Sequence, residues 1–172
     1  EWQLSGLRCD NRLLKTLQPL LASGKRAITV AVHKNHQIIA LWAGFYDKAY
    51  GVAVDVGSTT IAAHLCDLAS GQVLASASTM NPQIRFGEDL MSRVSYVMMH
   101  PEGADEMTVV IRQALNRLFV EVVEELGVGI EDILEITLVA NPIMHHILLG
   151  ISPVELGGAP FALTTNAAVE MP

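Results

Sequence analysis

Apolar residues in this sequence change between helical and strand-like spacing, and each change predicts a new element. Leucines at helical spacing predict a helix over residues 10–23, which Pro19 breaks or kinks and Gly24 ends. From Arg26 the period becomes two, and a polar turn at 34–36 separates two runs that predict a hairpin over residues 26–43. A helix and one hairpin are too small to fold well alone.

Three short apolar runs follow, with tight polar turns between them. They cover residues 51–56, 61–66 and 73–78 and predict three consecutive antiparallel strands. The first run is almost continuously apolar, which is typical of a buried strand. It ends in the polar turn 55–60, Asp-Val-Gly-Ser-Thr-Thr.

The rest of the chain is mainly helical. The spacing predicts a helix from residue 87 to near 100, and a longer one over 107–126 that stops at Gly127. A buried strand is expected over 134–140, and Asn141-Pro142 then begins a short helix that runs to Gly150. Residues 151–172 give no clear element.

Two groups of side chains on these helices have a simple structural interpretation. Helical spacing places Met98, Met99 and Met107 in the core rather than on an adaptable binding face. A run of acidic residues is expected on a solvated helix face: Glu121, Glu124 and Glu125.

The order of elements predicts an α/β fold. Residues 48–172 would contain three antiparallel strands, then helices and a further strand, and residues 1–47 a small α+β segment of a helix and a hairpin. We therefore expect two domains, with a boundary near residue 47.

Composition narrows the classes of function. The 172 residues carry a net charge of −7, which argues against a nucleic-acid partner, because phosphate binding needs clustered Lys and Arg. No apolar run approaches the ~20 residues of a membrane span. Hydrophobic residues make up 51% and charged ones 17%, which excludes disorder and leaves little charge to cover the surface. We expect some apolar surface to meet a partner domain or a second copy in a homodimer.

The cysteines indicate a reduced, cytoplasmic setting. Cys9 and Cys66 are isolated thiols without a CxxC pattern. Two thiols do not supply the four ligands that an iron–sulfur cluster normally takes, so no cluster is expected within this sequence.

The turn at 55–60 has the composition of a phosphate-binding loop. Amides and hydroxyls can hold phosphate oxygens, and a carboxylate such as Asp55 can hold a hydrated Mg²⁺. A glycine at 57 permits close approach of the backbone to a phosphate. The simpler interpretation is a hairpin turn rich in Gly, Ser and Asp. A carboxylate at the end of a buried strand would be costly without a partner or an ion, which favours the phosphate-binding interpretation.

Longer strings carry a family resemblance. Residues 50–78 resemble the opening of the ribonuclease H-like, actin-like ATPase fold, in which a DxGxT turn is the first phosphate loop. Residues 81–96 (NPQIRFGEDLMSRVSY) and 139–161 (VANPIMHHILLGISPVELGGAPF) resemble the ATP-dependent reductive activators of corrinoid proteins. The stretch before Gly51 is similar to the small middle domain of those activators.

The resemblance implies roles for the loop residues. Asp55 would be catalytic, orienting the attacking water or Mg²⁺, with the metal held through water. The phosphates of ATP would be contacted by Gly57, Ser58, Thr59 and Thr60. The second phosphate loop and the adenosine pocket lie in the other half of the fold, and no second DxG loop follows here. We therefore expect a central piece of a longer protein, with a [2Fe–2S] domain upstream and the second ATPase half as a partner.

The resemblance also implies an activity. The full protein would couple ATP hydrolysis to the reduction of an inactive Co(II) corrinoid protein of a methyltransferase system to Co(I). Two alternatives remain open at this point: a small-molecule kinase of the same superfamily, and a docking or assembly module that has lost nucleotide binding.

Other polar residues have less certain roles. Asp89 and Arg93 lie one helical turn apart, and we expect an ion pair between them rather than contact of Arg93 with nucleotide or partner. Asn81, Gly87 and Ser92 fall on the same string without an assigned role. The pairs His33/His36 and His145/His146 lack a convincing third ligand and are interpreted as turn and packing residues. His145 or His146 could also help to recognise a partner.

Overall fold

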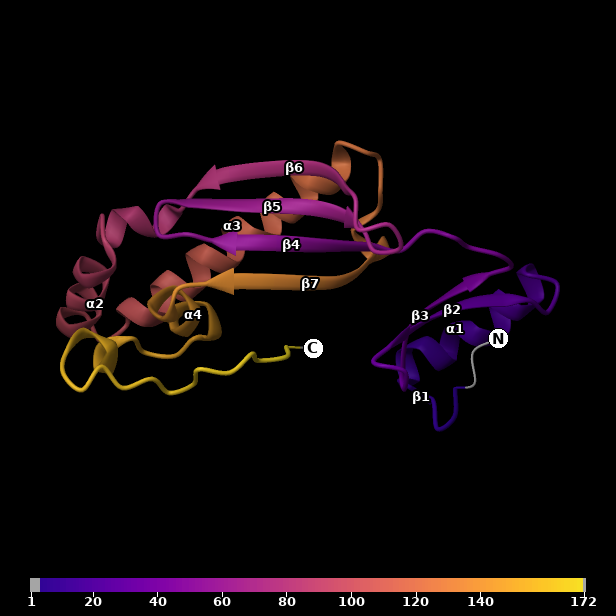
Figure 1. Ribbon diagram of the computed structural model, residues 1–172, viewed down its shortest axis with the longest axis horizontal. Coiled ribbons are helices and arrows are strands. Elements are labelled where there is room, and N and C mark those ends of the chain that lie inside the picture. The colour runs from indigo at the N-terminus through magenta and orange to yellow at the C-terminus, as the bar shows by residue number, and fades with distance from the viewer. Residues whose placement is uncertain (1–3, 172) are drawn as a thin grey trace. The chain divides into compact units, whose positions relative to one another are not determined.

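The computed structural model describes residues 4–171, which divide into two compact units between Tyr50 and Gly51. Each unit has its own sheet (Figure 1). The predicted α/β class is confirmed. Within the described residues, no helix has both the length and the apolar character needed to cross a bilayer.

The first unit is a helix packed with a small sheet. Its elements are β1 (Arg8–Cys9), α1 (Asn11–Ser23), β2 (Ile28–His33) and β3 (Gln37–Ala43). The sheet order is β1-β3-β2, with β1 parallel and β2 antiparallel to β3. The predicted helix and hairpin are confirmed, but α1 continues past Pro19 to Ser23, so the proline does not end the helix.

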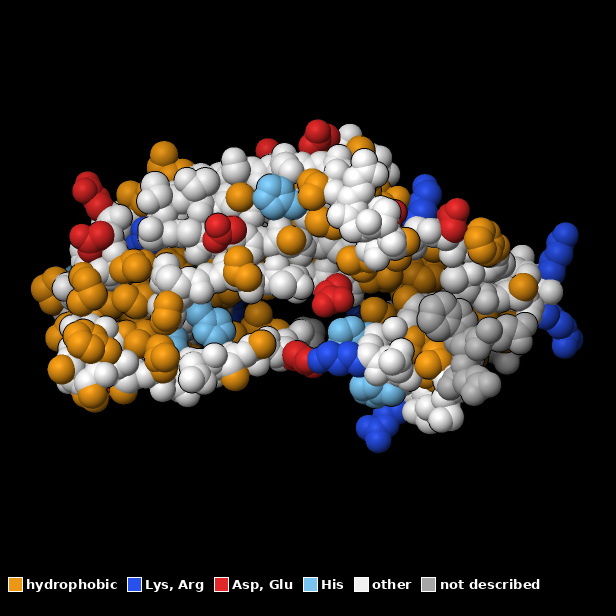
Figure 2. All heavy atoms as spheres, viewed as in Figure 1, with side chains coloured by type: hydrophobic (Ala, Val, Ile, Leu, Met, Phe, Trp, Pro, Cys, Tyr) orange, Lys and Arg blue, Asp and Glu red, His pale blue; other side chains and the backbone are white. Residues whose placement is uncertain are grey.

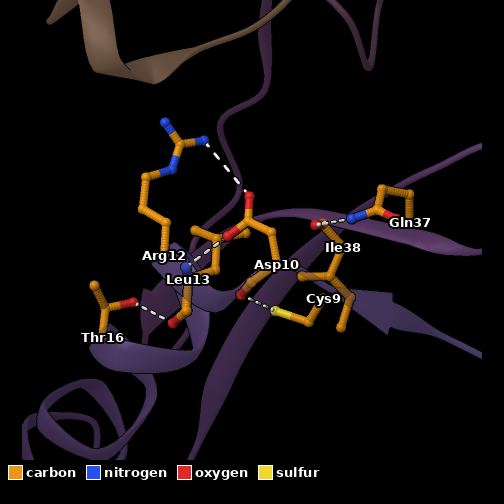
Figure 3. Close-up of polar contacts among 7 residues, drawn as sticks. All are labelled: Cys9, Asp10, Arg12, Leu13, Thr16, Gln37 and Ile38. Carbon is orange, nitrogen blue, oxygen red and sulfur yellow. Dashed lines mark hydrogen bonds and ion pairs between the residues drawn. The ribbon is translucent and has the colours of Figure 1, made fainter. Parts of the chain in front are cut away.

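Local hydrogen bonds define the start of α1 (Figure 3). Asp10 is the N-cap, and its Oδ1 accepts a hydrogen bond from the Leu13 amide at 2.8 Å. Its other oxygen, Oδ2, lies 3.8 Å from the Arg12 guanidinium. At the far end, the Gly24 amide donates to the Leu20 carbonyl. The amphipathic pattern and these two ends explain why residues 11–23 form a helix.

The second unit is a four-stranded sheet with helices on one side. Its strands are β4 (Tyr50–Val56), β5 (Thr60–Asp67), β6 (Val73–Met80) and β7 (Ile133–Ala140), in the order β6-β5-β4-β7. Figure 1 shows β4, β5 and β6 alternating in direction, as predicted, and β7 running the same way as β4. Two longer helices, α2 (Leu90–Met99) and α3 (Gly103–Glu124), connect β6 to β7, and α4 (Pro142–Leu149) follows. Short 3₁₀ turns lie at Pro82–Phe86, Ile130–Asp132 and Val154–Gly157.

The core lies between this sheet and α3. Alternate residues of β4 and β5 point into it, including Val54, Val56 and Ile61, none more than 2% exposed. From α3, Met107, Ile111 and Leu118 meet them, again at no more than 1% exposure. In Figure 1 α3 lies behind the strands, so the face of the sheet toward the viewer has no helix of the described chain over it.

Two expectations about burial are wrong. The strand at 133–140 is present, but it is the edge strand β7, and its Val139 is 59% exposed. Met98 and Met99 are 66% and 71% exposed, because the inward face of α2 is set by Val94 and Val97 instead. Met107 is fully buried and Glu121, Glu124 and Glu125 are exposed, as predicted. Figure 2 shows hydrophobic side chains gathered on the surface at the α2 end of this unit.

Candidate phosphate-binding site

The loop between β4 and β5 is a tight hairpin turn. The Gly57 amide donates to the Thr60 carbonyl at 3.0 Å. A Cβ atom at position 57 would lie 2.6 Å from that same carbonyl oxygen, so only glycine fits without a shift of the backbone. The turn therefore requires the glycine of the DxG sequence, because a larger residue would clash within the loop.

Three successive carbonyls of this loop are held from the inner side. The Gly57 carbonyl accepts a hydrogen bond from Asn81 Nδ2 at 2.8 Å, and the Thr59 carbonyl accepts one from the Asn81 amide at 2.8 Å. Between them, the Ser58 carbonyl accepts a hydrogen bond from Arg93 Nη2. The conformation of the loop is therefore set by residues outside it.

This anchoring decides where the loop amides point. A trans peptide places each N–H opposite the preceding carbonyl, so the amides of Ser58 and Thr59 point away from Asn81 and Arg93. Among the described residues none accepts a hydrogen bond from these two amides or forms one with the hydroxyls of Ser58, Thr59 and Thr60. Successive free amides form a concave anion-binding surface. These free donors could bind the oxygens of an anion such as a phosphate.

Asp55 lies next to this loop with its carboxylate free. It is the penultimate residue of β4, and side chains alternate along that strand, so Val54 and Val56 are buried whereas Asp55 is exposed. The expectation of a carboxylate at the end of a buried strand is therefore wrong, because only one face of β4 is covered. Its carboxylate makes no hydrogen bond or ion pair within residues 4–171. An unengaged carboxylate near free amides and hydroxyls has the chemistry that could hold a hydrated Mg²⁺ together with a phosphate.

The residues behind the loop form a buried polar network. Asn81, Gln83 and Arg93 are each 0% exposed. Asn81 Oδ1 accepts from the Gln83 amide at 2.9 Å, and Gln83 Nε2 donates to the Met107 carbonyl at 3.0 Å. Arg93 Nε donates to the Gly87 carbonyl at 3.0 Å, and its Nη1 contacts Gln83 Oε1 at 3.4 Å and Met144 Sδ at 3.1 Å. The network joins the loop to α2, α3 and α4.

The expected ion pair between Asp89 and Arg93 does not form. Asp89 is instead the N-cap of α2: its Oδ1 accepts from the Ser92 amide at 2.7 Å, and Ser92 Oγ in turn accepts from the Asp89 amide at 3.1 Å. The hydrogen bonds from the Ser92 amide and hydroxyl lower the pKa of the Asp89 carboxyl. The Arg93 side chain leaves the helix on the opposite, buried side.

The guanidinium of Arg93 is buried without a carboxylate partner in residues 4–171. Its acceptors are three neutral oxygens and one thioether sulfur, and no carboxylate within the described residues lies within ion-pair distance. Desolvation lowers the pKa of Arg93, an effect that the more distant Asp89 partly opposes. The site therefore holds a buried positive charge directly behind the loop.

The partner expected for Arg93 from the sequence, Asp89, is wrong. No role was expected for Gln83. One signal was available in the helix pattern. Arg93 falls in the same helical phase as Leu90, Val94 and Val97, the apolar side of α2. A charged residue in that phase indicates a buried, hydrogen-bonded side chain rather than a surface pair.

The histidines have local structural contacts. His36 Nδ1 lies 3.0 Å from the Lys34 carbonyl in its own turn. His146 is buried, with Nδ1 2.8 Å from the Pro142 carbonyl and Nε2 accepting from the Thr164 amide at 3.1 Å. Both of its ring nitrogens are thereby satisfied, which agrees with a packing role. Residues 4–171 contain no group of three or more His, Cys, Asp or Glu side chains arranged to hold a metal.

Comparison with known proteins shows the family of this chain. The family described as the RACo middle region matches residues 50–172, and the RACo linker region matches residues 1–48. The chain belongs to the RACo family. The resemblance to the reductive activators of corrinoid proteins, inferred from the strings at 81–96 and 139–161, is confirmed.

Two relatives give the extent of the similarity. The "Corrinoid activation enzyme RamQ" of Eubacterium limosum is 34% identical over 112 residues, which is 65% of this chain and 19% of that protein. A solved structure of a "Reductive activator for corrinoid,iron-sulfur protein" aligns with a TM-score of 0.78 and 28% identity, over 92% of this chain and 26% of that one. The chain thus spans about a fifth to a quarter of the length of these relatives.

Proposed function

We propose that this RACo-family chain supplies the first phosphate-binding loop of an ATP-dependent activator, which reduces an inactive Co(II) corrinoid protein to Co(I). In this proposal residues 48–172 are the first half of an actin-like ATPase domain, and residues 1–47 form the small domain that precedes it. The corrinoid protein belongs to a methyltransferase system, and the electron comes from a [2Fe–2S] cluster outside this sequence. The names of the relatives support the substrate class.

One structural observation carries the nucleotide part of the proposal. The carbonyls of Gly57, Ser58 and Thr59 are all engaged on the inner side of the loop, and the free amides of Ser58 and Thr59 point to the other side. An ordinary hairpin turn has no need for two buried polar side chains to hold its carbonyls. A loop that binds phosphate does, since a carbonyl turned outward would repel the anion.

Each loop residue then has a chemical task. The amides of Ser58 and Thr59 and the hydroxyls of residues 58–60 bind phosphate oxygens. Asp55 accepts hydrogen bonds from water, either the water that attacks the γ-phosphorus or the waters around Mg²⁺. When bound, Mg²⁺ neutralises the charge that develops on the β- and γ-phosphate oxygens. Hydrolysis breaks the bond between the γ-phosphorus and the β–γ bridging oxygen, giving ADP and inorganic phosphate.

The decisive substitution is Asp55→Asn in the complete natural protein, because it removes the charge and keeps the size of the side chain. We expect ATP hydrolysis, followed by phosphate release, to fall by about 100-fold or more. Asp67→Asn is the matched control. Asp67 also lies in a turn at an end of β5, but its carboxylate is used within that turn, accepting from the Ala69 and Ser70 amides at 2.9 and 2.7 Å.

The control should leave hydrolysis unchanged. Hydrolysis at the wild-type rate by the Asp55→Asn protein would refute the role of this loop. Corrinoid reduction is measured in parallel from the loss of the Co(II) absorption band with a low-potential reductant present. ATP-dependent phosphorylation of a small molecule without reduction would instead favour the kinase alternative.

A further inference from the structure

Arg93 donates a hydrogen bond to the Ser58 carbonyl, although the two residues lie 35 positions apart in the sequence. We propose that Arg93 is a positioning residue for the nucleotide phosphates: it fixes the Ser58–Thr59 peptide with its N–H toward the ligand, and its buried charge is balanced by the bound polyphosphate. This inference rests on the proposed function, and it names the group that makes the loop selective for phosphate.

The Ser58–Thr59 peptide lies at the tip of the loop. Asn81 holds the peptides on either side through the Gly57 and Thr59 carbonyls, whereas Arg93 alone holds the Ser58 carbonyl. Ser58 and Thr59 lie outside both flanking strands, so no ladder hydrogen bond restrains this peptide. Without Arg93, rotation of this peptide would turn the Ser58 carbonyl outward and the Thr59 amide inward. The anion-binding surface would then lose a donor and gain an acceptor.

The positive charge of Arg93 lacks an anionic partner among the described residues. A fully buried guanidinium with only neutral acceptors carries a desolvation cost that a nearby anion would relieve. Asp89 does not relieve it, because its carboxylate caps α2. Asp55 does not either, because it lies on the uncovered face of β4 and makes no ion pair within the described residues. An anion bound to the free amides on the outer side of the loop would be separated from the Arg93 guanidinium only by the backbone of the loop.

The planar guanidinium of an arginine suits this position. Its three nitrogens reach four acceptors at once. Nε donates to the Gly87 carbonyl, Nη1 contacts Gln83 and Met144, and Nη2 donates to the Ser58 carbonyl. A Cβ atom at position 87 would lie 2.7 Å from the Arg93 amide, so glycine at 87 permits this close approach. A lysine keeps the charge but lacks the planar fork, so it cannot hold all of these groups together.

The test separates phosphate recognition from general stability. ATP, ADP and adenosine are titrated by calorimetry, in the presence of Mg²⁺, into the complete natural protein and its Arg93→Met and Arg93→Lys variants. We expect Arg93→Met to weaken ATP and ADP binding by about 10- to 100-fold, while adenosine binds as in the wild type. Arg93→Lys should recover part of that loss, since it restores the charge alone.

Arg112→Met is the matched control. Arg112 also donates from Nε and Nη2 to a backbone carbonyl, that of Leu148, at 3.1 and 2.8 Å, and within the described residues it forms no hydrogen bond with the loop. Its variant should bind all three ligands as the wild type does. If Arg93→Met does not fold, Arg93→Lys carries the same comparison between ATP and adenosine.

Three results would overturn the proposal in distinguishable ways. Equal loss of ATP and adenosine affinity would make Arg93 a general structural residue, and unchanged ATP affinity would remove it from the site. In both cases the proposed function stands, provided that the wild type binds ATP and Asp55→Asn blocks hydrolysis. Absence of ATP binding by the wild type would instead remove the proposed function together with this inference.

Discussion

The two units of this chain differ most in their cores. Every buried residue of the described chain belongs to the second unit, whereas none of residues 4–50 is fully buried. The first unit relies on an N-cap, a hairpin and half-buried apolar contacts, while the second packs α3 against a sheet. This difference explains why the anchored loop lies in the second unit, because holding three loop carbonyls in place requires buried polar groups and a rigid core around them.

The largest expected difference comes from equal truncations in the two units. Leu118→Ala removes a side chain that is 1% exposed in α3 and should lower the free energy of unfolding of the second unit by about 2–5 kcal/mol. Leu14→Ala removes one that is 50% exposed in α1 and should cost under about 1 kcal/mol. Urea denaturation followed by far-ultraviolet circular dichroism measures both. Similar losses would show that the two units do not differ in core packing.

A substitution in α1 should reduce the difference in stability between the two units. Pro19 lies inside this helix, where it removes a backbone donor. Pro19→Ala should therefore stabilise the first unit by about 2 kcal/mol, the helix gain being reduced by the greater freedom of the unfolded chain. Tryptophan fluorescence reports this unit, since both tryptophans precede residue 51 and Trp42 stacks on Tyr46 at 4.6 Å.

Pro142→Ala is the control for this substitution. Pro142 occupies the first turn of α4, where no helical hydrogen bond is lost, so its replacement should give no such gain. An unchanged fluorescence transition in the Pro19→Ala protein would mean that contacts of α1 with the sheet, rather than its helical propensity, limit the stability of the first unit.

The smallest expected effect concerns the helix caps and depends on pH. The pKa of Asp89 is lowered in the folded protein, so its cap stabilises α2 above the unfolded carboxyl pKa of about 3.9 and loses that effect as the pH falls through the folded value. Asp89→Ala should lower the urea midpoint of the second unit at pH 7, by less than Leu118→Ala does. The difference from the wild type should shrink below about pH 4.

The cap of α1 provides the comparison. Asp10→Ala removes the corresponding hydrogen bond to the Leu13 amide and should shift only the tryptophan transition of the first unit. A difference between Asp89→Ala and the wild type that stays constant from pH 7 to pH 3 would show that the charge of Asp89 does not contribute to the cap.

Much of the fold was predictable because the signals are local. The caps at Asp10 and Asn141-Pro142 and the stop at Gly150 mark helix ends within a few residues. The apolar spacing located β4, β5, β6 and α3. The exposure of β7 and of Met98 was not predictable, since it depends on which strand lies at the edge and which face of α2 meets the core.

The position and the donor groups of the loop at 55–60 follow from the sequence, because a short stretch of Asp, Gly, Ser and Thr between two apolar runs predicts a turn. The exposure of Asp55 and the hydrogen-bond partners of Arg93 depended on the tertiary structure. Coverage of one face of β4 leaves Asp55 exposed, and packing of α2 brings Arg93 to the Ser58 carbonyl across 35 residues of sequence. Burial decides such contacts, and burial is a property of the surfaces that meet rather than of neighbouring residues.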